Sequence, residues 1–226
     1  MDDAKRYAGE WSARYVQDGM VVGLGTGSTV FYAIQKIGEL IKQGLTIQAV
    51  ASSERSEKLA REMNIPIVPF TSIDSIDLYI DGADEADRHG HLIKGGGGAH
   101  TREKILAYNS KKFIVIVDSA KLVERLGKFP LPVEILPFAA ELTLKHLKAL
   151  GCEPRLRRNG DQQYISENGN FTADCQFNTI EDPAHLDAAI RSIPGVVATG
   201  LFANTMVSMV IAGYADGTVK EIKPRE

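Results

Sequence analysis

The sequence predicts an α/β protein, with a Rossmann-like parallel-sheet domain and a smaller split-βαβ (ferredoxin-like) α+β domain. Three observations support this fold class. Short apolar runs alternate with amphipathic segments over the first half of the chain, which is typical of a parallel sheet covered by helices on both faces. Glycine-rich and polar stretches follow those runs directly, where open parallel sheets bind ligands. After about residue 131 the predicted order becomes β-α-β-β-α-β, the split βαβ arrangement.

The first domain begins with a predicted helix over 3–17, because apolar residues recur there at helical spacing and Asp18-Gly19 ends the pattern. Apolar runs then predict strands, and the amphipathic segments between them predict helices. The strands are expected at 20–24, 46–51, 77–80 and 113–117, with a short extended segment at 65–69. The helices are expected at 30–41, 53–63 and 101–109, and a β-hairpin turn at His89-Gly90.

The small domain is expected at 131–203. Its predicted elements are an extended segment at 131–137, strands at 153–158, 170–177 and 196–202, and helices at 141–150 and 183–193. Gly151 ends the first of these helices, and Pro183 suits the first turn of the second. Because the apolar run 206–212 can rejoin the first sheet, the Rossmann-like catalytic domain is expected to comprise residues 1–130 and 204–226.

The composition of the 226-residue chain is that of an ordinary globular protein, with 44% hydrophobic and 24% charged residues. A net charge of -3 gives no reason to expect nucleic acid. Cys152 and Cys175 form neither a CxxC pair nor a disulfide framework. The segment MDDAKRYAGEW lacks the apolar core of a signal peptide, and no apolar run approaches the roughly 18 residues of a membrane span. We therefore expect a cytoplasmic protein that binds neither nucleic acid nor a membrane.

The first chemically informative loop is GLGTGST, residues 23–29, between a predicted strand and a predicted helix. Backbone N–H groups at a helix N-terminus attract a phosphate, and glycines let the phosphate approach closely. Ser28 stands where a dinucleotide fingerprint needs its third glycine, and no Lys follows as in a Walker A loop. The loop favours anion binding, and a tight βα turn with a good N-cap is the alternative.

The second loop is DGADEAD, residues 81–87, directly after the predicted strand DLYI. It crowds four carboxylates into seven positions: Asp81, Asp84, Glu85 and Asp87. Such crowding can raise the pKa of a carboxyl group, and proton-transfer chemistry uses groups of this kind. Taken alone, the loop fits a solvated acidic turn better. Asp81 and Asp84 point to a site because they lie at a strand end beside Gly82.

The third loop is IKGGGGAHTREKI, residues 93–105. Its four glycines, Gly95 to Gly98, present bare backbone that a ligand can approach closely. Glu103 falls in or near the first turn of the helix that follows. If the loop binds no ligand, Lys94 is an ordinary surface lysine, and Glu103 is an acid that only complements the helix dipole.

A metal site is an alternative use of this region, because His89 and His91 lie near the carboxylates of the second loop. An HxH pair with scattered aspartates is a loose pattern. A hairpin with exposed histidines explains it better, so neither a metal nor another cofactor is expected.

Together the three loops combine an anion cradle, carboxylates, one lysine and one further glutamate, without a nucleophile of Ser–His or Cys–His type. This set suits proton abstraction next to a carbonyl in a small phosphorylated substrate. A carboxylate base moves the proton, while a lysine and backbone N–H groups stabilise the developing enediolate oxygen.

Five segments resemble ribose-5-phosphate isomerases of type A. They are GLGTGST, SSERSEKLA, DLYIDGADEAD, LIKGGGGAHTREKI and VDSAKLVERLGKFPLPVEI, in this order between about Tyr15 and Ile135. The resemblance implies that D-ribose 5-phosphate and D-ribulose 5-phosphate are interconverted in the non-oxidative branch of the pentose phosphate pathway, without a metal. It also implies a Rossmann-like domain with a smaller α/β domain, in a homodimer or homotetramer.

The resemblance also implies roles for individual residues. Glu103 would be the base that moves the proton between C1 and C2, and Asp81 would help to open the sugar ring. Asp84 and Lys94 would handle the hydroxyl protons and the enediolate charge. The remaining expected contacts with the sugar phosphate are Thr26, Gly27, Ser28, Thr29, Gly82, Ala83, Gly95, Gly96, Gly97 and Lys121.

Two positions depart from the family pattern. The family often has a lysine near its N-terminus that reaches the phosphate, and here Lys5-Arg6 stands in that region. His100 follows the glycines where the family commonly has Ala and then an apolar residue, and the sequence assigns it no role.

Other classes of protein share related folds. A non-enzymatic sugar-phosphate sensor is one alternative, although no segment is left over for a DNA-binding module. An amino-sugar phosphate deaminase or a CoA transferase is another, and the motifs fit both families less well.

Overall fold

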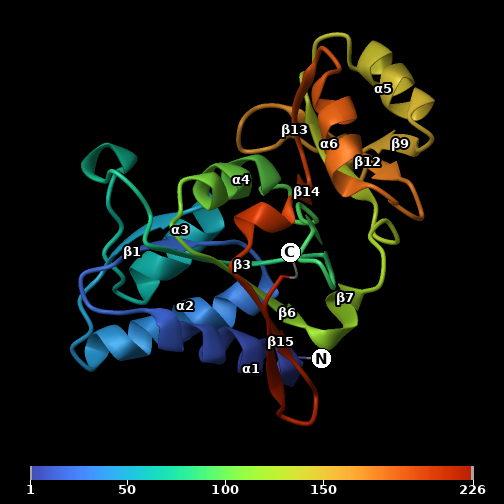
Figure 1. Ribbon diagram of the computed structural model, residues 1–226. Helices are drawn as coiled ribbons and strands as arrows, with labels where there is room; N and C mark the ends of the chain where they lie inside the picture. Colours follow the sequence, from blue (N-terminus) through green and yellow to red (C-terminus); the bar gives the residue numbers. More distant parts are fainter. Residues whose placement is uncertain (1, 225–226) are drawn as a thin grey trace.

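The computed structural model describes residues 2–224, and its largest sheet has the strand order β16-β15-β6-β3-β1-β2 (Figure 1). All neighbouring strands run parallel except β16, which is antiparallel to β15. The strands are β1 (Val21–Leu24), β2 (Gln48–Ala51), β3 (Leu78–Gly82), β6 (Phe113–Asp118), β15 (Met209–Gly213) and β16 (Val219–Ile222). Met1 and residues 225–226, the outer ends of the predicted catalytic domain, lie outside the described residues.

Helices cover both faces of this sheet, as the near-continuous apolar strands require. One apolar core joins the sheet to α1 (Asp2–Ser12), α2 (Ser28–Lys42) and α3 (Glu54–Glu62), and a second core joins the other face to α4 (His100–Tyr108). Tyr79 of β3 and Phe113 of β6 stack in the second core, with ring centroids 4.9 Å apart. The predicted helix 3–17 is shorter than expected, because a 3₁₀ turn at Ala13–Tyr15 follows α1.

A second sheet, with the strand order β13-β8-β12-β9, forms the smaller α+β unit at the upper right of Figure 1. Its elements follow the predicted β-α-β-β-α-β order, and all neighbouring strands are antiparallel. They are β8 (Leu131–Ile135), α5 (Ala140–Ala149), β9 (Glu153–Leu156), β12 (Phe171–Gln176), α6 (Pro183–Arg191) and β13 (Val196–Thr199). A short hairpin of β10 (Arg158–Asn159) and β11 (Gln162–Gln163) separates β9 from β12. The exact limits predicted for the two domains stay a prediction.

A third, small sheet connects the two units, with the order β14-β5-β4-β7. It consists of β4 (Glu85–Asp87), β5 (Leu92–Ile93), β7 (Leu122–Val123) and β14 (Leu201–Phe202). The prediction of one continuous strand over 196–202 was therefore wrong, because the chain changes sheets at Gly200. The Gly200 carbonyl accepts a hydrogen bond from Lys94 N at 2.9 Å, and a Cβ there would lie 2.3 Å from Lys94 O. Through this break the small unit contacts Lys94, the residue that precedes the four glycines.

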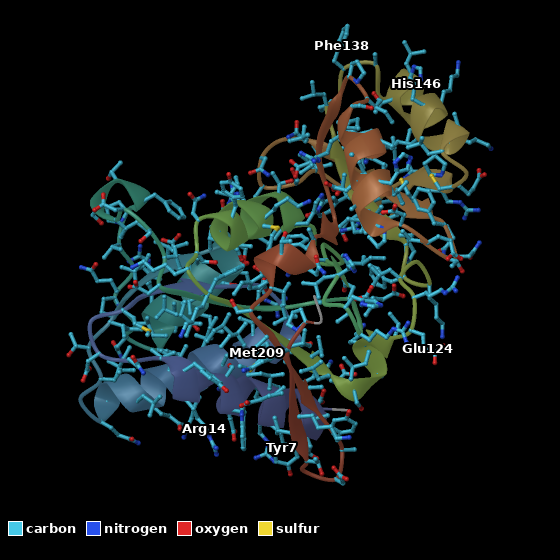
Figure 2. All side chains as sticks on the ribbon, viewed as in Figure 1. Tyr7, Arg14, Glu124, Phe138, His146 and Met209 are labelled. Carbon is cyan, nitrogen blue, oxygen red and sulfur yellow. The ribbon has the colours of Figure 1, made fainter. Side chains whose placement is uncertain are left out.

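The outer end of the small unit carries exposed apolar side chains. Phe138, labelled in Figure 2, is 87% exposed, and Leu136 and Leu142 are exposed beside it in the sequence. Within residues 2–224, none of the helices has the length and apolar character needed to cross a membrane.

Candidate active site

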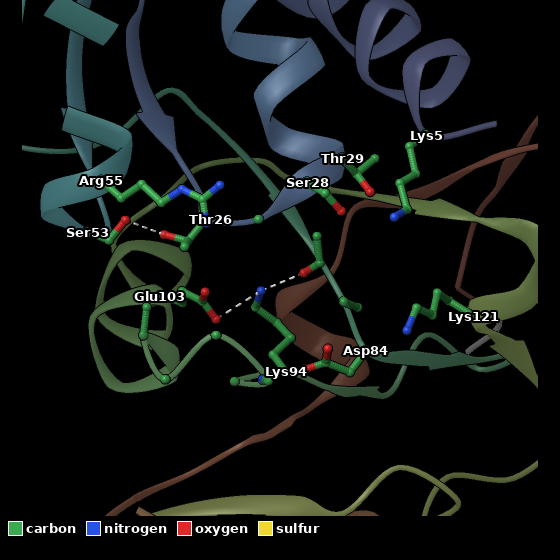
Figure 3. A pocket seen from close by; sticks show the side chains of 18 of the residues that line it. Lys5, Thr26, Ser28, Thr29, Ser53, Arg55, Asp84, Lys94, Glu103 and Lys121 are labelled. Atoms are coloured by element: carbon green, nitrogen blue, oxygen red, sulfur yellow. Dashed lines mark hydrogen bonds and ion pairs between the residues drawn. The ribbon is translucent and has the colours of Figure 1, made fainter. Parts of the chain in front are cut away.

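The three predicted loops meet at one cavity of about 390 Å³ at the carboxyl ends of β1 and β3 (Figure 3). Its walls contain these predicted residues: Thr26, Gly27, Ser28, Thr29, Gly82, Ala83, Asp84, Lys94, Gly95, Gly96, Gly97, Glu103 and Lys121. Asp81 is the one predicted site residue that lies behind the wall, fully buried at the end of β3. The sequence motifs are far apart in the chain, and the parallel sheet brings them together.

The first loop leads from β1 into the N-terminus of α2, whose first residue is Ser28. Gly25 lets this loop pass close to the end of β3, because a Cβ there would lie 2.1 Å from Asp81 Oδ1. The Thr26 hydroxyl hydrogen bonds with the hydroxyls of Ser52 at 2.8 Å and Ser53 at 2.7 Å, which ties the loop to the start of α3. The open N-terminus of α2 faces the cavity, as an anion site requires.

Two lysines complete this end of the cavity. Lys5 of α1 and Lys121 both line it, and Figure 3 shows their ammonium groups on the same side as Ser28 and Thr29. Arg6, the next residue in the segment where the family often has a phosphate-binding lysine, instead pairs with Asp3 on the surface of α1 at 3.1 Å. The structure therefore places Lys5, and not Arg6, in the same cavity wall as Ser28 and Thr29.

The opposite side of the cavity contains a buried cluster of one lysine and two carboxylates. Lys94 Nζ donates to Asp81 Oδ2 at 2.8 Å and to the Gly82 carbonyl at 2.5 Å. It also lies 3.1 Å from Glu103 Oε2, an ion pair that lacks the alignment of a hydrogen bond. All three side chains are at most 5% exposed, so the surface-lysine alternative for Lys94 was wrong.

Asp81 is held from four directions. Its Oδ1 accepts hydrogen bonds from Thr26 N at 2.9 Å and Gly82 N at 2.7 Å. Its Oδ2 accepts from Lys94 and from the hydroxyl of Tyr79. Tyr79 and Asp81 are two residues apart on β3 and so share a face of the strand. Burial, with the adjacent Asp81 charge, raises the pKa of Tyr79 well above its usual value, so its hydroxyl stays a donor.

Burial also shifts the protonation of the base candidate. Desolvation, reinforced by the Asp81 charge and opposed by Lys94, raises the pKa of Glu103 from 4.5 to about 8. Burial alone would lower the pKa of Lys94, but the charges of Asp81 and Glu103 outweigh it and raise that pKa above its usual value. Lys94 is therefore cationic across the working pH range, while Glu103 can both take up and release a proton near neutral pH.

The four carboxylates of the second loop separate into different environments. Asp84 lines the cavity, and its Oδ2 accepts a hydrogen bond from Gly96 N at 2.7 Å. Glu85 is buried and accepts from Gly127 N at 2.7 Å and Phe129 N at 2.6 Å. Because three of the four are buried, the loop is not the solvated acidic turn that was its alternative reading.

The two histidines of the hairpin do not gather a metal-binding set. His91 Nδ1 lies 3.0 Å from Asp87 Oδ2, while His89 is exposed. Among the residues that the structure describes, no group of three or more His, Cys, Asp or Glu side chains is placed to hold a metal ion.

His100, which the sequence left without a role, is the first residue of α4 and is fully buried. Desolvation lowers its pKa to about 4, so the ring is neutral at pH 7. Neither ring nitrogen has a hydrogen-bond partner within residues 2–224. The ring packs against the backbone of Gly95, outside the cavity wall.

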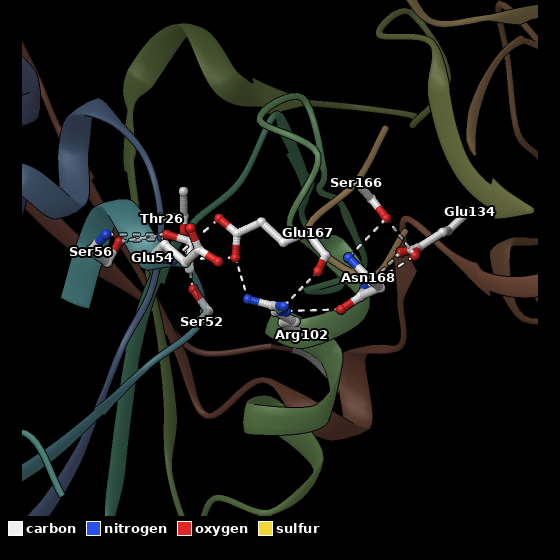
Figure 4. A network of polar contacts seen from close by, with 10 residues as sticks. Thr26, Ser52, Glu54, Ser56, Arg102, Glu134, Ser166, Glu167 and Asn168 are labelled. Carbon is white, nitrogen blue, oxygen red and sulfur yellow. Dashed lines mark hydrogen bonds and ion pairs between the residues drawn. The ribbon is translucent and has the colours of Figure 1, made fainter. Parts of the chain in front are cut away.

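Sequence reasoning missed several wall residues. Ser53 and Arg55 come from the start of α3, and Tyr164 and Glu167 come from the small unit. Glu167 accepts from Glu54 N at 3.2 Å and pairs with Arg102 of α4 (Figure 4). Asn168 and Ser166, beside it, donate to the buried Glu134 at 3.1 and 2.9 Å. The quoted segment SSERSEKLA pointed to the first pair, but nothing in the sequence signalled that the small unit closes the cavity.

Known proteins resemble the chain over almost its whole length. The family model described as Ribose 5-phosphate isomerase A (phosphoriboisomerase A) matches residues 48–217. Ribose-5-phosphate isomerase A of Bacillus mycoides is 49% identical, covering 98% of this chain and 100% of the relative. The solved ribose 5 phosphate isomerase A of Neisseria gonorrhoeae is 39% identical, with a TM-score of 0.92 and coverage of 100% and 98%. A solved D-ribose-5-phosphate isomerase in complex with phospho-erythronic acid is also 39% identical, with a TM-score of 0.93 and 97% coverage of both chains.

Proposed function

This chain belongs to the ribose 5-phosphate isomerase A family, and we propose how its cavity interconverts D-ribose 5-phosphate and D-ribulose 5-phosphate. The reaction is an aldose–ketose isomerisation in the non-oxidative branch of the pentose phosphate pathway. Neither the fold nor the comparisons support the sensor alternative.

The phosphate of the substrate binds at the N-terminus of α2. Ser28 and Thr29 offer hydroxyl and backbone N–H donors there, and Lys5 and Lys121 add two positive charges. Charge-assisted hydrogen bonds of this kind are stronger than neutral ones. Because these contacts are the same in the substrate and in the transition state, they hold the sugar in place and mainly set KM.

Proton transfer takes place at the other end of the cavity. Ionised Glu103 removes the proton from C2 of the open-chain aldose, and the electron pair of that C–H bond forms the C1–C2 double bond of the enediolate. Lys94 and backbone N–H groups of the glycine loop, Gly95 to Gly98, stabilise the negative oxygen. Protonated Glu103 then returns the proton to C1 while a carbonyl forms at C2. Asp84 lines the cavity and can relay the proton between the two hydroxyl oxygens.

Asp81 supports this step from behind the wall. Four hydrogen bonds occupy its carboxylate, and it holds the Lys94 ammonium in place. Because Asp81 does not itself reach the cavity, it acts on ring opening only by holding the Lys94 ammonium, which donates a hydrogen bond to the sugar.

One observation carries the assignment, the buried Glu103 carboxylate beside Lys94 in the wall of a cavity whose far end is an anion cradle. The direct test incubates the purified protein with ribose 5-phosphate and follows ribulose 5-phosphate by absorbance. Phospho-erythronic acid, which a solved relative binds, should inhibit competitively. Tight binding of ribose 5-phosphate without turnover would contradict the isomerase assignment and favour a sensor.

We further propose that the protein is a homodimer or homotetramer. The exposed apolar side chains of Leu136, Phe138 and Leu142 at the outer end of the small unit support an interface with a second copy. Phe138→Asp should reduce the mass measured by light scattering, while Tyr108→Asp, at an exposed tyrosine on α4, should not. A monomeric wild-type protein would contradict this proposal.

We also propose a cytoplasmic location. Both cysteines, Cys152 and Cys175, are free and buried, which suits a reducing compartment. Cell fractionation tests this, and recovery of the protein outside the cytoplasmic fraction would overturn it.

A further inference from the structure

One side chain of the small unit reaches the glycine loop of the cavity. Arg157 follows β9 directly, and its guanidinium Nε and Nη2 donate to the two carboxylate oxygens of Asp174 at 3.0 and 2.5 Å. Its third nitrogen, Nη1, donates to the carbonyls of Gly95 at 2.9 Å and Gly96 at 3.2 Å. Arg157 therefore links the small sheet to two successive peptide groups of the loop.

The surroundings hold this guanidinium in one orientation. The Arg157 side chain is 14% exposed, and the ring of Tyr164, which also lines the cavity, lies over it at 5.6 Å. The planar fork of arginine can serve a carboxylate on one edge and carbonyls on another, which the single ammonium of lysine cannot do. The contact is thus specific for arginine at this position.

The direction of the two carbonyls fixes the direction of the next two N–H groups. A trans peptide points its C=O and its N–H to opposite sides, and the described peptide bonds are all trans. The Gly95 and Gly96 carbonyls face Arg157, so Gly96 N–H and Gly97 N–H both face away from it. The Gly96 N–H donates to Asp84 Oδ2 at 2.7 Å. Gly97 lines the cavity, and its N–H has no protein acceptor within residues 2–224.

We propose that Arg157 is a positioning residue, which aims the Gly97 N–H at the substrate oxygen on which the enediolate charge develops. The proposal rests on the isomerase function of the same cavity. Two successive N–H groups that point the same way form an anion-binding concavity, and Asp84 occupies only one of them. The small unit thereby contributes to the chemistry through the loop, although its own arginine does not touch the reacting atoms.

The test compares Arg157→Met with Arg158→Met. Arg158 is the adjacent residue, is exposed, and among the described residues donates only to the Asp161 carbonyl, at 3.2 Å. Because a misdirected oxyanion donor mainly affects the transition state, Arg157→Met should lower kcat about 10- to 100-fold while KM changes less than about threefold. Competitive inhibition by inorganic phosphate should be unchanged, and Arg158→Met should behave as wild type. Arg157→Lys should restore less than half of the lost activity.

A second variant keeps the test decisive if Arg157→Met does not fold. Asp174→Asn keeps the shape of the side chain but weakens its hydrogen bonds with Arg157. It should lower kcat about 3- to 10-fold, again with KM changed less than about threefold. The double variant should be no slower than Arg157→Met, because both changes act on one contact. Wild-type kcat in Arg157→Met or, if that variant does not fold, in Asp174→Asn would overturn the proposal. So would a loss confined to KM and phosphate affinity. A wild-type protein without turnover would instead overturn the isomerase function, so the two failures are distinguishable.

Discussion

The Lys94 ammonium lies 3.1 Å from Glu103 Oε2, with both side chains buried in the cavity wall. Lys94 precedes the four glycines and Glu103 follows them on α4, so the chain folds back between these two residues and brings their side chains into contact. Asp81 shares the same ammonium, which leaves two carboxylates for one cation. The pair therefore places a carboxylate of raised pKa, the base of the proposed mechanism, directly beside a cation that can stabilise negative charge on the substrate.

Asp81→Asn should shift the acidic limb of the profile of kcat/KM against pH to lower pH. The Asp81 charge helps to raise the pKa of Glu103, so its removal lowers that pKa and keeps the base ionised in more acidic solution. The pH dependence of kcat/KM checks this, because it reports the ionisation of the free enzyme. A limb that stays in place or moves to higher pH would show that Asp81 does not act on Glu103.

Glu103→Gln should stabilise the fold in alkaline solution. Because the pKa of Glu103 is raised in the folded state, its ionised form destabilises the fold. This destabilisation is absent below pH 4.5 and complete above about pH 8. The Tm of Glu103→Gln should therefore exceed that of wild type by about 3 °C or more at pH 9, with a smaller difference at pH 5. Glu141→Gln, at an exposed position of α5, is the control. An equal difference at both pH values would contradict the raised pKa.

Lys5→Met should weaken substrate binding, whereas Arg6→Met should not. Lys5 lines the anion end of the cavity, while Arg6 pairs with Asp3 on the helix surface. Loss of one hydrogen bond to a charged group corresponds to roughly a 10- to 100-fold rise in KM. Steady-state kinetics of the two adjacent variants decide the point, and a larger effect of Arg6→Met would reverse the assignment.

EDTA should leave the activity unchanged, because Lys94 already supplies the positive charge at the reacting end of the cavity. The protein is dialysed against EDTA and assayed before and after addition of divalent cations. Activity that falls and returns with a metal would revive the site at His89 and His91.

Much of the fold follows from local patterns in the sequence. The buried strands of the large sheet are continuous apolar runs, and the glycines and caps between them mark where helices begin. The same patterns predicted the β-α-β-β-α-β order of the small unit. The break at Gly200 was missed because Val196 to Phe202 reads as one strand, and the tertiary contacts of Gly200 with Lys94 and Pro132 divide it.

The site was predictable where motifs follow strands and unpredictable where tertiary contacts decide. Asp81 and Asp84 stood out at a strand end beside Gly82. The position of Glu103 alone favoured an acid that complements the helix dipole, and its role as the base came from the resemblance to the family. The burial of Asp81 depends on tertiary contacts with Thr26 and Lys94. The closure of the cavity by Tyr164 and Glu167 depends on how the two units pack. No local spacing encodes such contacts.

The role of Glu103 as the base is decided by the turnover of Glu103→Gln with ribose 5-phosphate, measured together with its affinity for the same sugar phosphate. Glutamine keeps the shape of the side chain but cannot accept the proton. We expect a loss in kcat of about 10²- to 10⁴-fold or more, as for removal of a general base, with substrate affinity nearly unchanged. A variant that keeps more than about a tenth of wild-type turnover would contradict the assignment of Glu103 as the base.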